Sequence, residues 1–416
     1  MKDQVVLVIS GHGANAAIRG LMEDYAVALE SAGSSVVHIT TEPAEVQYGL
    51  DLIKQGGVKF ALTWLGILQN LQADRERDGR AGNAFDAFGV PLVKLQGDLP
   101  AYFEVRHWDV PRNTINLYQA EEFVRYRRRW LPGATALTSL LPPMPMAPMD
   151  RDGVDLATRR RGKLFFLKNG NSPAGLRDLW RTRLPSSTAE LLVVLAQEIE
   201  RVGTKARPFH IGDFVADFLL ENHAIFDPPS QLIAFLSAQM DDYLRRVKST
   251  MIAEAILDLP VVVQGNFWSH VDFTGKRAQL VEGQDVDASQ PIVKHQLGVI
   301  DMSANVDTWP HDRVQRAAGS FALVLTNRQG WLSQHFPGFD ELMFDFEPDL
   351  IRERIHDAIA HPGRYIEQAL EFGLRFREVY PREAFSTRVN ELVDLAKLLC
   401  NEPKPSVQPF FSWPPR

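Results

Sequence analysis

The stretch 297–365 reads LGVIDMSANVDTWPHDRVQRAAGSFALVLTNRQGWLSQHFPGFDELMFDFEPDLIRERIHDAIAHPGRY, and its pattern predicts the fold of the surrounding chain. Apolar runs at 297–302 and 321–325 are typical of strands buried on both faces, and a short helix is expected from His311. A last short strand, 342–346, precedes a long helix. This order indicates an open α/β sheet, in which ligands bind beyond the carboxyl ends of the strands.

The first 140 residues show the same alternation of strands and helices, which predicts a doubly wound domain. Its first strand, 5–9, is followed by Gly11 and Gly13, which allow a ligand to approach the backbone closely. A dinucleotide fingerprint would need a third glycine where Ala16 stands, so the motif is incomplete. A plain strand-to-helix turn is the alternative interpretation.

Composition limits the class of protein. The chain has 416 residues, too many for one ordinary core, so two domains are expected. A net charge of −7 argues against a general nucleic-acid binder. The single cysteine, Cys400, cannot form an internal disulfide, and we find neither a signal peptide nor a membrane-spanning run. We therefore expect a soluble, cytoplasmic protein.

Prolines mark the expected domain boundary. Four of them lie in LLPPMPMAPMD at 140–150, which can neither continue a helix nor form a central strand. We expect four parts: an N-terminal domain at 1–140, a linker at 141–162, a C-terminal domain at 163–382 with a helical insertion at about 209–250, and a terminal helix and tail at 383–416. The N-terminal domain is the candidate surface on which that tail packs.

Two arginine runs, 125–129 and 159–161, are interpreted as a solvated helix face and a linker flank. A surface for nucleic acid or an acidic acceptor is the alternative interpretation. No metal-binding spacing is convincing, since the acidic pair Asp285 and Asp287 lies in an expected loop.

The C-terminal half resembles the CgeB-like (spore-maturation-type) glycosyltransferases. The resemblance covers about two thirds of the chain and is absent around 209–244. It rests on the order of many short motifs: Gly89-Val90-Pro91, Asp98-Leu99-Pro100, Gly265-Asn266-Phe267-Trp268, Arg313, Ala322-Leu323-Val324-Leu325-Thr326, Phe336-Pro337-Gly338, Glu341, Phe344-Asp345, His361-Pro362, Gly373 and Arg388.

This resemblance implies a GT-B fold, in which two Rossmann-like domains face a cleft. It implies a nucleotide-sugar donor on the C-terminal domain, an acceptor on the N-terminal domain, and chemistry without a metal or other cofactor. The chain departs from the family at Arg316, where a glutamate commonly holds the donor ribose. An arginine cannot accept a hydroxyl proton, so ribose binding must differ here or the alignment is shifted.

Donor binding requires cations and N–H groups near the leaving phosphate. Arg313, at the start of the expected helix, is the first candidate for a phosphate clamp, and Arg316 lies on the same helix face. The other donor-side candidates are Asn169, Gly170, Asn171, Gly265, Asn266, Trp268, Thr326 and Glu341. For Trp268 a core position is the alternative interpretation.

An inverting transferase needs a base for the acceptor hydroxyl. Asp98, after an expected strand, and His12, between two glycines, are the candidates. Gly11, Gly13, Glu104 and His107 are further acceptor-side candidates. A turn-capping role is the alternative for Asp98.

The resulting hypothesis is a glycosyltransferase that uses a nucleotide sugar and an unknown acceptor, which is a glycan, a small molecule or a protein. Two alternatives stay open: a non-catalytic GT-B-like nucleotide or carbohydrate binding protein, and a nucleotide-sugar epimerase or oxidoreductase. The sequence does not reveal the sugar, the base of the donor or the stereochemistry.

Overall fold

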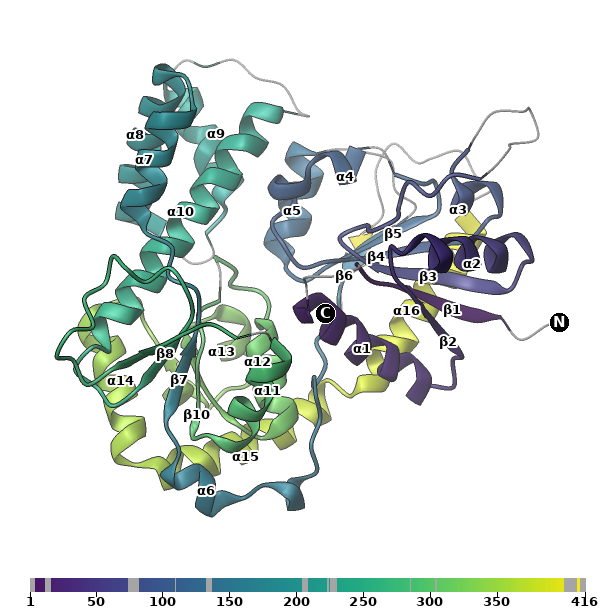
Figure 1. Ribbon diagram of the computed structural model, residues 1–416. Coiled ribbons are helices and arrows are strands. Elements are labelled where there is room, and N and C mark those ends of the chain that lie inside the picture. The colour runs from purple at the N-terminus through teal and green to yellow at the C-terminus, as the bar shows by residue number, and fades with distance from the viewer. Residues whose placement is uncertain are drawn as a thin grey trace. The chain divides into compact units, whose positions relative to one another are not determined.

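A computed structural model gives the fold of the chain (Figure 1). It describes residues 4–11, 16–73, 82–108, 110–131, 137–203, 209–222, 224, 230–284, 286–303, 305–399 and 410–411. The chain divides into two compact units, each described by itself below. Unit 1 comprises Met1–Met144, Asp227–Gln231 and Tyr380–Arg416, and unit 2 comprises Pro145–Phe226 and Leu232–Val379.

Unit 1 is an α/β unit, as the alternation of apolar runs and amphipathic segments predicts. Its described elements are β1 (Val5–Ile9), α1 (Ala16–Ser31), β2 (Val36–Ile39), α2 (Pro43–Lys54), β3 (Val58–Trp64), α3 (Ala84–Ala87), β4 (Leu92–Gln96), η1 (Pro100–Phe103), α4 (Val105–Trp108), β5 (Thr114–Tyr118), α5 (Glu121–Trp130), β6 (Leu137–Leu140), α16 (Arg382–Leu399) and β13 (Phe410–Phe411).

The described strands of unit 1 form one parallel sheet in the order β13-β6-β5-β4-β3-β1-β2. The terminal helix α16 packs on α1, where the rings of Tyr25 and Phe385 lie 4.7 Å apart. Ser386 Oγ of α16 donates a hydrogen bond to the main-chain oxygen of Ala28 at 2.6 Å. The end of the chain is therefore part of the unit that the start of the chain builds.

Unit 2 is a second α/β unit. Its described elements are η2 (Arg151–Gly153), α6 (Leu156–Arg161), β7 (Leu164–Leu167), α7 (Pro173–Arg183), α8 (Ser186–Gly203), α9 (Ile211–Glu221), α10 (Gln231–Ala255), β8 (Val262–Gln264), β9 (Gln279–Val281), α11 (Val286–His295), β10 (Gly298–Ile300), α12 (Asp312–Ser320), β11 (Leu323–Asn327), α13 (Gly330–His335), η3 (Asp340–Leu342), β12 (Met343–Phe344), α14 (Pro348–Ala360) and α15 (Pro362–Val379).

The described strands of unit 2 form a parallel sheet in the order β12-β11-β10-β7-β8-β9. Helices α7 to α10 stand as a group beyond the end of this sheet where β7 leads into α7 (Figure 1). The described helices of this segment run from Pro173 to Ala255, and the expected insertion at about 209–250 corresponds to α9 and α10 within it.

The expected linker at 141–162 is only partly a connection. Residues 145–162 belong to unit 2 and include α6. Arg159 of α6 is 1% exposed and donates hydrogen bonds to the main-chain oxygens of Lys294 and Ser320, both at 2.8 Å from Nη2. The interpretation of 159–161 as a solvated flank is wrong for Arg159, because its guanidinium binds the carbonyl groups at the ends of α11 and α12.

The run 125–129 is also not wholly a solvated face. Arg127 of α5 is buried, whereas Arg128 and Arg129 are exposed. A run of five residues spans both faces of a helix, since successive residues are about 100° apart. Two members of the run, Tyr126 and Arg127, therefore point into the unit.

The strand expected at 321–325 lies two residues further along the chain. Phe321 ends α12 in a left-handed conformation with φ of 55°, and β11 runs from Leu323 to Asn327. Thr326 is thus inside the strand, and its side chain has a fixed direction.

Candidate active site

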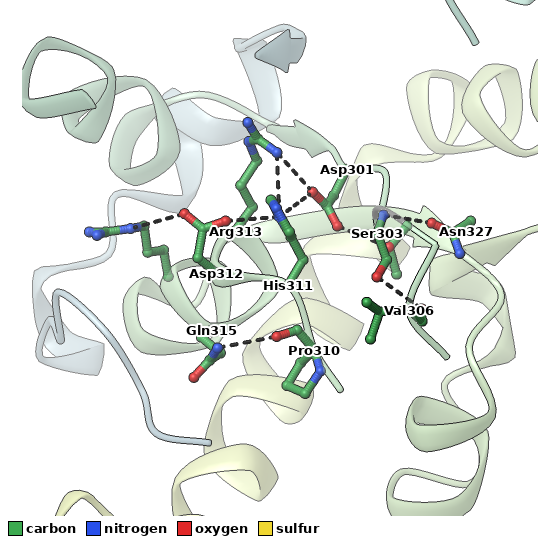
Figure 2. Close-up of polar contacts among 11 residues, drawn as sticks. Asp301, Ser303, Val306, Pro310, His311, Asp312, Arg313, Gln315 and Asn327 are labelled. Carbon is green, nitrogen blue, oxygen red and sulfur yellow. Dashed lines mark hydrogen bonds and ion pairs between the residues drawn. The ribbon is translucent and has the colours of Figure 1, made fainter. Parts of the chain in front are cut away.

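A cluster of charged side chains lies at the carboxyl end of β10 in unit 2 (Figure 2). Asp301 follows the last residue of the strand directly and is fully buried. Thr326 of the neighbouring strand β11 donates from Oγ1 to Asp301 Oδ2 at 3.2 Å. Gly298 begins β10 at a position where a Cβ would lie 2.3 Å from the main-chain oxygen of Leu323, so only glycine allows this approach.

His311 and Arg313, at the start of α12, point at Asp301 (Figure 2). His311 Nδ1 lies 3.0 Å from Asp301 Oδ1 and 2.9 Å from Asp312 Oδ1. Arg313 Nη1 lies 3.3 Å from Asp301 Oδ1. His311 is the N-cap residue of α12, and its side chain makes no capping hydrogen bond to the helix.

The two carboxylates determine the charge of His311. Burial acts to lower the pKa of His311, but the charges of Asp312 and Asp301 outweigh it and raise this pKa to about 9. Burial likewise acts to raise the pKa of Asp301, and the charges of His311 and Arg313 outweigh it and keep that pKa low. At neutral pH the cluster therefore holds an imidazolium and a guanidinium beside two carboxylates.

Lys168, at the end of β7, adds a further cation to this edge. Burial lowers the pKa of its ammonium to about 8, assisted by the charges of Arg313 and Arg245 and opposed by those of Asp301 and Asp242. Lys168 is still mostly protonated at pH 7. Three cations, Lys168, His311 and Arg313, thus face two carboxylates, Asp301 and Asp312.

The predicted loops after β7 and β8 bind each other. Asn169 Oδ1 accepts from the backbone N–H of Asn266 at 2.9 Å, and the N–H of Gly170 donates to the main-chain oxygen of Asn266 at 2.8 Å. A Cβ on Gly265 would lie 2.0 Å from the main-chain oxygen of Lys168. Asn171 is exposed at the end of the first loop.

Trp268 supports these loops and is 2% exposed. Its Nε1 donates to the main-chain oxygen of Lys168 at 2.8 Å, and its ring occupies the space where a Cβ on Gly170 would be. The structure thus gives Trp268 the packing role. Phe267 is 68% exposed and has φ of 65°, a conformation that is rare for a large side chain. Phe267 is therefore the aromatic residue of this loop that is available to a ligand.

Of the other donor-side candidates, Arg316 lies beside the cluster, whereas Glu341 contacts a different helix. Arg316 is buried on α12, with Nε 3.8 Å from Asp312 Oδ2. Glu341 accepts from Gln368 Nε2 at 2.6 Å and lies 3.5 Å from Arg364 Nε. Those two partners belong to α15, so the contacts of Glu341 are separate from those of Asp301.

The acceptor-side candidates all fall in unit 1. Asp98 is half-buried in the loop after β4, and Gly11 is exposed after β1. Glu104 is half-buried and its pKa is raised by burial. His107 is buried on α4, and burial, followed by nearby cations, lowers its pKa well below the ordinary value. His12 and Gly13 lie outside the described residues.

No group of three or more His, Cys, Asp or Glu side chains in the described chain could hold a metal ion. The expected metal independence stays a prediction. No helix of the described chain is long and apolar enough to cross a membrane.

A pocket of about 410 Å³ lies elsewhere in unit 2, between β12 and α14. Arg328, Asp345, Glu353 and Arg354 are among the residues that line it, and none of the Asp301 cluster does. We place the candidate site at the cluster, since there the charges converge at strand ends and a helix N-terminus.

Sequence reasoning missed Asp301, His311 and Lys168 as members of the site. The signal for Asp301 and Lys168 was available, because each is the first charged residue after a buried strand. For His311, one of the two carboxylates that keep it charged, Asp312, is the next residue in the sequence, and only the fold reveals the other, Asp301.

No protein-family model and no curated protein matches the chain. Solved structures do match. One is T4 phage BGT in complex with its UDP-glucose substrate, with a TM-score of 0.52, 8% identity, and coverage of 94% of this chain and 100% of that chain. Another is the DNA modifying enzyme β-glucosyltransferase, with a TM-score of 0.51, 9% identity, and the same coverage. The expected fold class is confirmed: two parallel sheets with flanking helices form the GT-B fold of glycosyltransferases.

Proposed function

We propose that this chain is a glycosyltransferase that binds a nucleotide-sugar donor in unit 2 at Asp301, His311, Arg313 and Lys168. The supporting observation is the surplus of cations at this edge of a GT-B unit, beside the N-terminus of α12. A diphosphate carries the negative charge that this arrangement lacks. Fixed cations there would also stabilise the charge that develops on the leaving group during transfer.

In this proposal, different segments at the strand ends bind the diphosphate and the base of the donor. The diphosphate lies against Arg313 and Lys168, and Phe267 stacks on the base from the loop after β8. A UDP-sugar is the first donor to test, since UDP-glucose is the substrate in a solved structure of the same fold. The order of the motifs from Gly265 onward supports the CgeB-like group as the closer relatives.

Calorimetric titration tests the proposal directly. UDP, UDP-glucose, GDP, ADP and NAD are titrated into the protein, and UDP release from UDP-glucose is followed with candidate acceptors in buffer containing EDTA, since no metal or other cofactor is proposed. We expect a nucleoside diphosphate to bind. Binding of NAD alone would favour the oxidoreductase, and nucleotide binding without transfer to any acceptor would favour the non-catalytic binding protein.

Arg313→Gln tests the phosphate clamp. Loss of a hydrogen bond to a charged group costs about 1.5–3 kcal/mol, so nucleotide affinity should fall by about 10- to 100-fold. Arg181→Gln is the matched control, because Arg181 is an exposed arginine of unit 2 that pairs with Asp178 on α7. Equal affinity for Arg313→Gln and the control would refute the clamp even if the class of protein is right.

A further inference from the structure

A second charged cluster, in unit 1, has no part in the donor site. Four polar residues are register neighbours across β3 to β6: Thr63, Lys94, Asn116 and Thr138. Paired residues of parallel strands point to the same face, so these side chains form one row across the sheet. All four are buried. A polar row through the middle of a doubly covered sheet is unusual, because such strands are normally apolar on both faces.

Lys94 is the charged member of this row and is 0% exposed. Its Nζ donates to the main-chain oxygen of Arg106 at 2.6 Å, and Arg106 Nη1 donates to the main-chain oxygen of Leu65 at 2.9 Å. Neither cation is bonded to a carboxylate in the described chain. Burial, followed by the charges of Arg127 and Arg106, lowers the pKa of Lys94 to about 7.

Among the described residues, the charged groups that act on Lys94 are cations. His107 Nδ1 lies 3.0 Å from Tyr118 Oη, and burial, followed by Lys94, Arg127 and Arg106, lowers the pKa of this histidine, so it is neutral. Burial raises the pKa of Tyr118, whose hydroxyl is hydrogen-bonded to Arg127. The cluster of Lys94, Arg106, Arg127, His107 and Tyr118 is therefore positive.

Two acidic residues lie on the neighbouring segments. Glu104, just before α4, is half-buried, and its pKa is raised by burial. Glu122 is buried on α5, five residues from Arg127, which places it about 140° away around the helix. Neither one is bonded to Lys94 or Arg106.

A buried donor in the same row also lacks an acceptor. Asn116 Oδ1 accepts from Gln96 Nε2 at 3.2 Å, but its Nδ2 has no hydrogen-bond partner in the described chain. A buried donor without an acceptor costs free energy that a bound acceptor would recover. Asn116 is the register neighbour of Lys94, so the amide and the ammonium lie on the same face of adjacent strands.

We propose that this face of unit 1 binds a compact oxyanion, a phosphate or sulfate group, against Lys94, Arg106 and Asn116. Arg106 is only partly buried and provides the edge from which the anion enters. The anion is a free ion or the phosphate of a larger ligand. The inference does not depend on the transferase assignment, because none of these residues belongs to the donor cluster.

Bound anion would hold Lys94 in its protonated form, so binding must take up a proton. At pH 8 a lysine with a pKa near 7 is about one-tenth protonated, and binding should take up close to one proton. Calorimetry at pH 8, in two buffers of different ionisation enthalpy, measures the number of protons taken up. Sulfate is the ligand used, because sulfate itself does not titrate at this pH.

The measurement uses the full chain with Lys168→Met and Arg313→Gln. These two substitutions remove cations of the proposed donor site, so that sulfate binding there does not contribute to the measured heat. Adding Lys94→Met should abolish both sulfate binding and proton uptake. This variant should still fold with a raised Tm in sulfate-free buffer, because it replaces a buried charge with an apolar chain of similar size. Sulfate binding that is unchanged by Lys94→Met, or that takes up no proton, would overturn the proposal.

A second titration with glucose 6-phosphate identifies the source of the anion. Tighter binding than sulfate, again lost in Lys94→Met, would place the oxyanion on a larger ligand. Equal affinity would indicate a free ion. If neither sulfate nor the sugar phosphate binds, the site does not exist.

Discussion

His311 shows how its neighbours determine the charge of one residue. Its folded pKa of about 9 lies above the ordinary value of 6.5. A raised pKa means that the folded state holds this proton more tightly than the unfolded state does. The resulting stability is therefore complete below pH 6.5, declines as the pH rises towards 9, and is absent above it.

His311→Gln should remove this pH-dependent stability. The wild type should be more stable at pH 6 by at most about 3 kcal/mol, and by less in practice because solvent screens a side chain that is 29% exposed. Urea unfolding of both proteins from pH 6 to 10 measures the difference, in which most other titrating groups cancel. A difference that stays constant over this range would mean that His311 is not held as an imidazolium.

Two arginines of unit 2, Arg159 and Arg181, also differ because their neighbours differ. Arg159 and Arg181 are similar in sequence terms, since each lies on a helix in a polar segment. Arg159 is buried against main-chain carbonyls, whereas Arg181 is exposed beside Asp178. Sequence pattern could not separate them, because the carbonyls that bind Arg159 come from residues more than 130 positions away.

Among the elements, α12 is the one that positions the charged cluster around Asp301. Its N-cap residue is His311 and its first turn carries Arg313, and its last turn is packed against the chain that enters unit 2. A Cβ on Gly319 would lie 1.9 Å from the main-chain oxygen of Met146. The backbone of Met146 cannot yield as a flexible side chain would, so this contact determines how close α12 lies.

Gly319→Ala should therefore displace α12. We expect a loss of about 1–3 kcal/mol in the free energy of unfolding, as for other overpacked positions, together with weaker nucleotide binding. Gly363→Ala, on α15, is the matched control, because its new Cβ would meet only Arg160 at 3.9 Å. Urea unfolding and calorimetry measure the two effects, and equal stability of the two variants would contradict the packing argument.

For the whole molecule, the candidate residues for donor binding and for base catalysis fall in different units. Asp98 lies in unit 1, whereas Arg313 and Lys168 lie in unit 2. If Asp98 is the base, its loss affects the transfer step and leaves donor binding intact.

Asp98→Asn should lower kcat by about 10²- to 10⁴-fold, the usual contribution of a general base, with nucleotide affinity unchanged. Initial rates of UDP release and calorimetric titration with UDP give the two quantities separately. Glu104→Gln is the control for another half-buried acid of unit 1 and should retain more activity. If Asp98→Asn is as active as the wild type, another group, such as His12, must act as the base.

The predicted alternation of strands and helices agrees with both sheets, and the helix expected at His311 begins there. Local pattern was sufficient for this, because the two periodicities of strand and helix are properties of neighbouring residues. The same reasoning placed Arg313 at a helix start beside a ligand edge.

The sequence by itself determined the α/β class, most of the strands and the position of Arg313. Only the tertiary structure decided that Lys168, Asp301 and His311 meet, and that Lys94 and Asn116 are neighbours in a buried polar row. The physical reason is that strand order brings distant segments together, and the apolar pattern of a strand does not specify its neighbours. Charge states depend on those neighbours, so the pKa values of His311 and Lys94 are properties of the folded units.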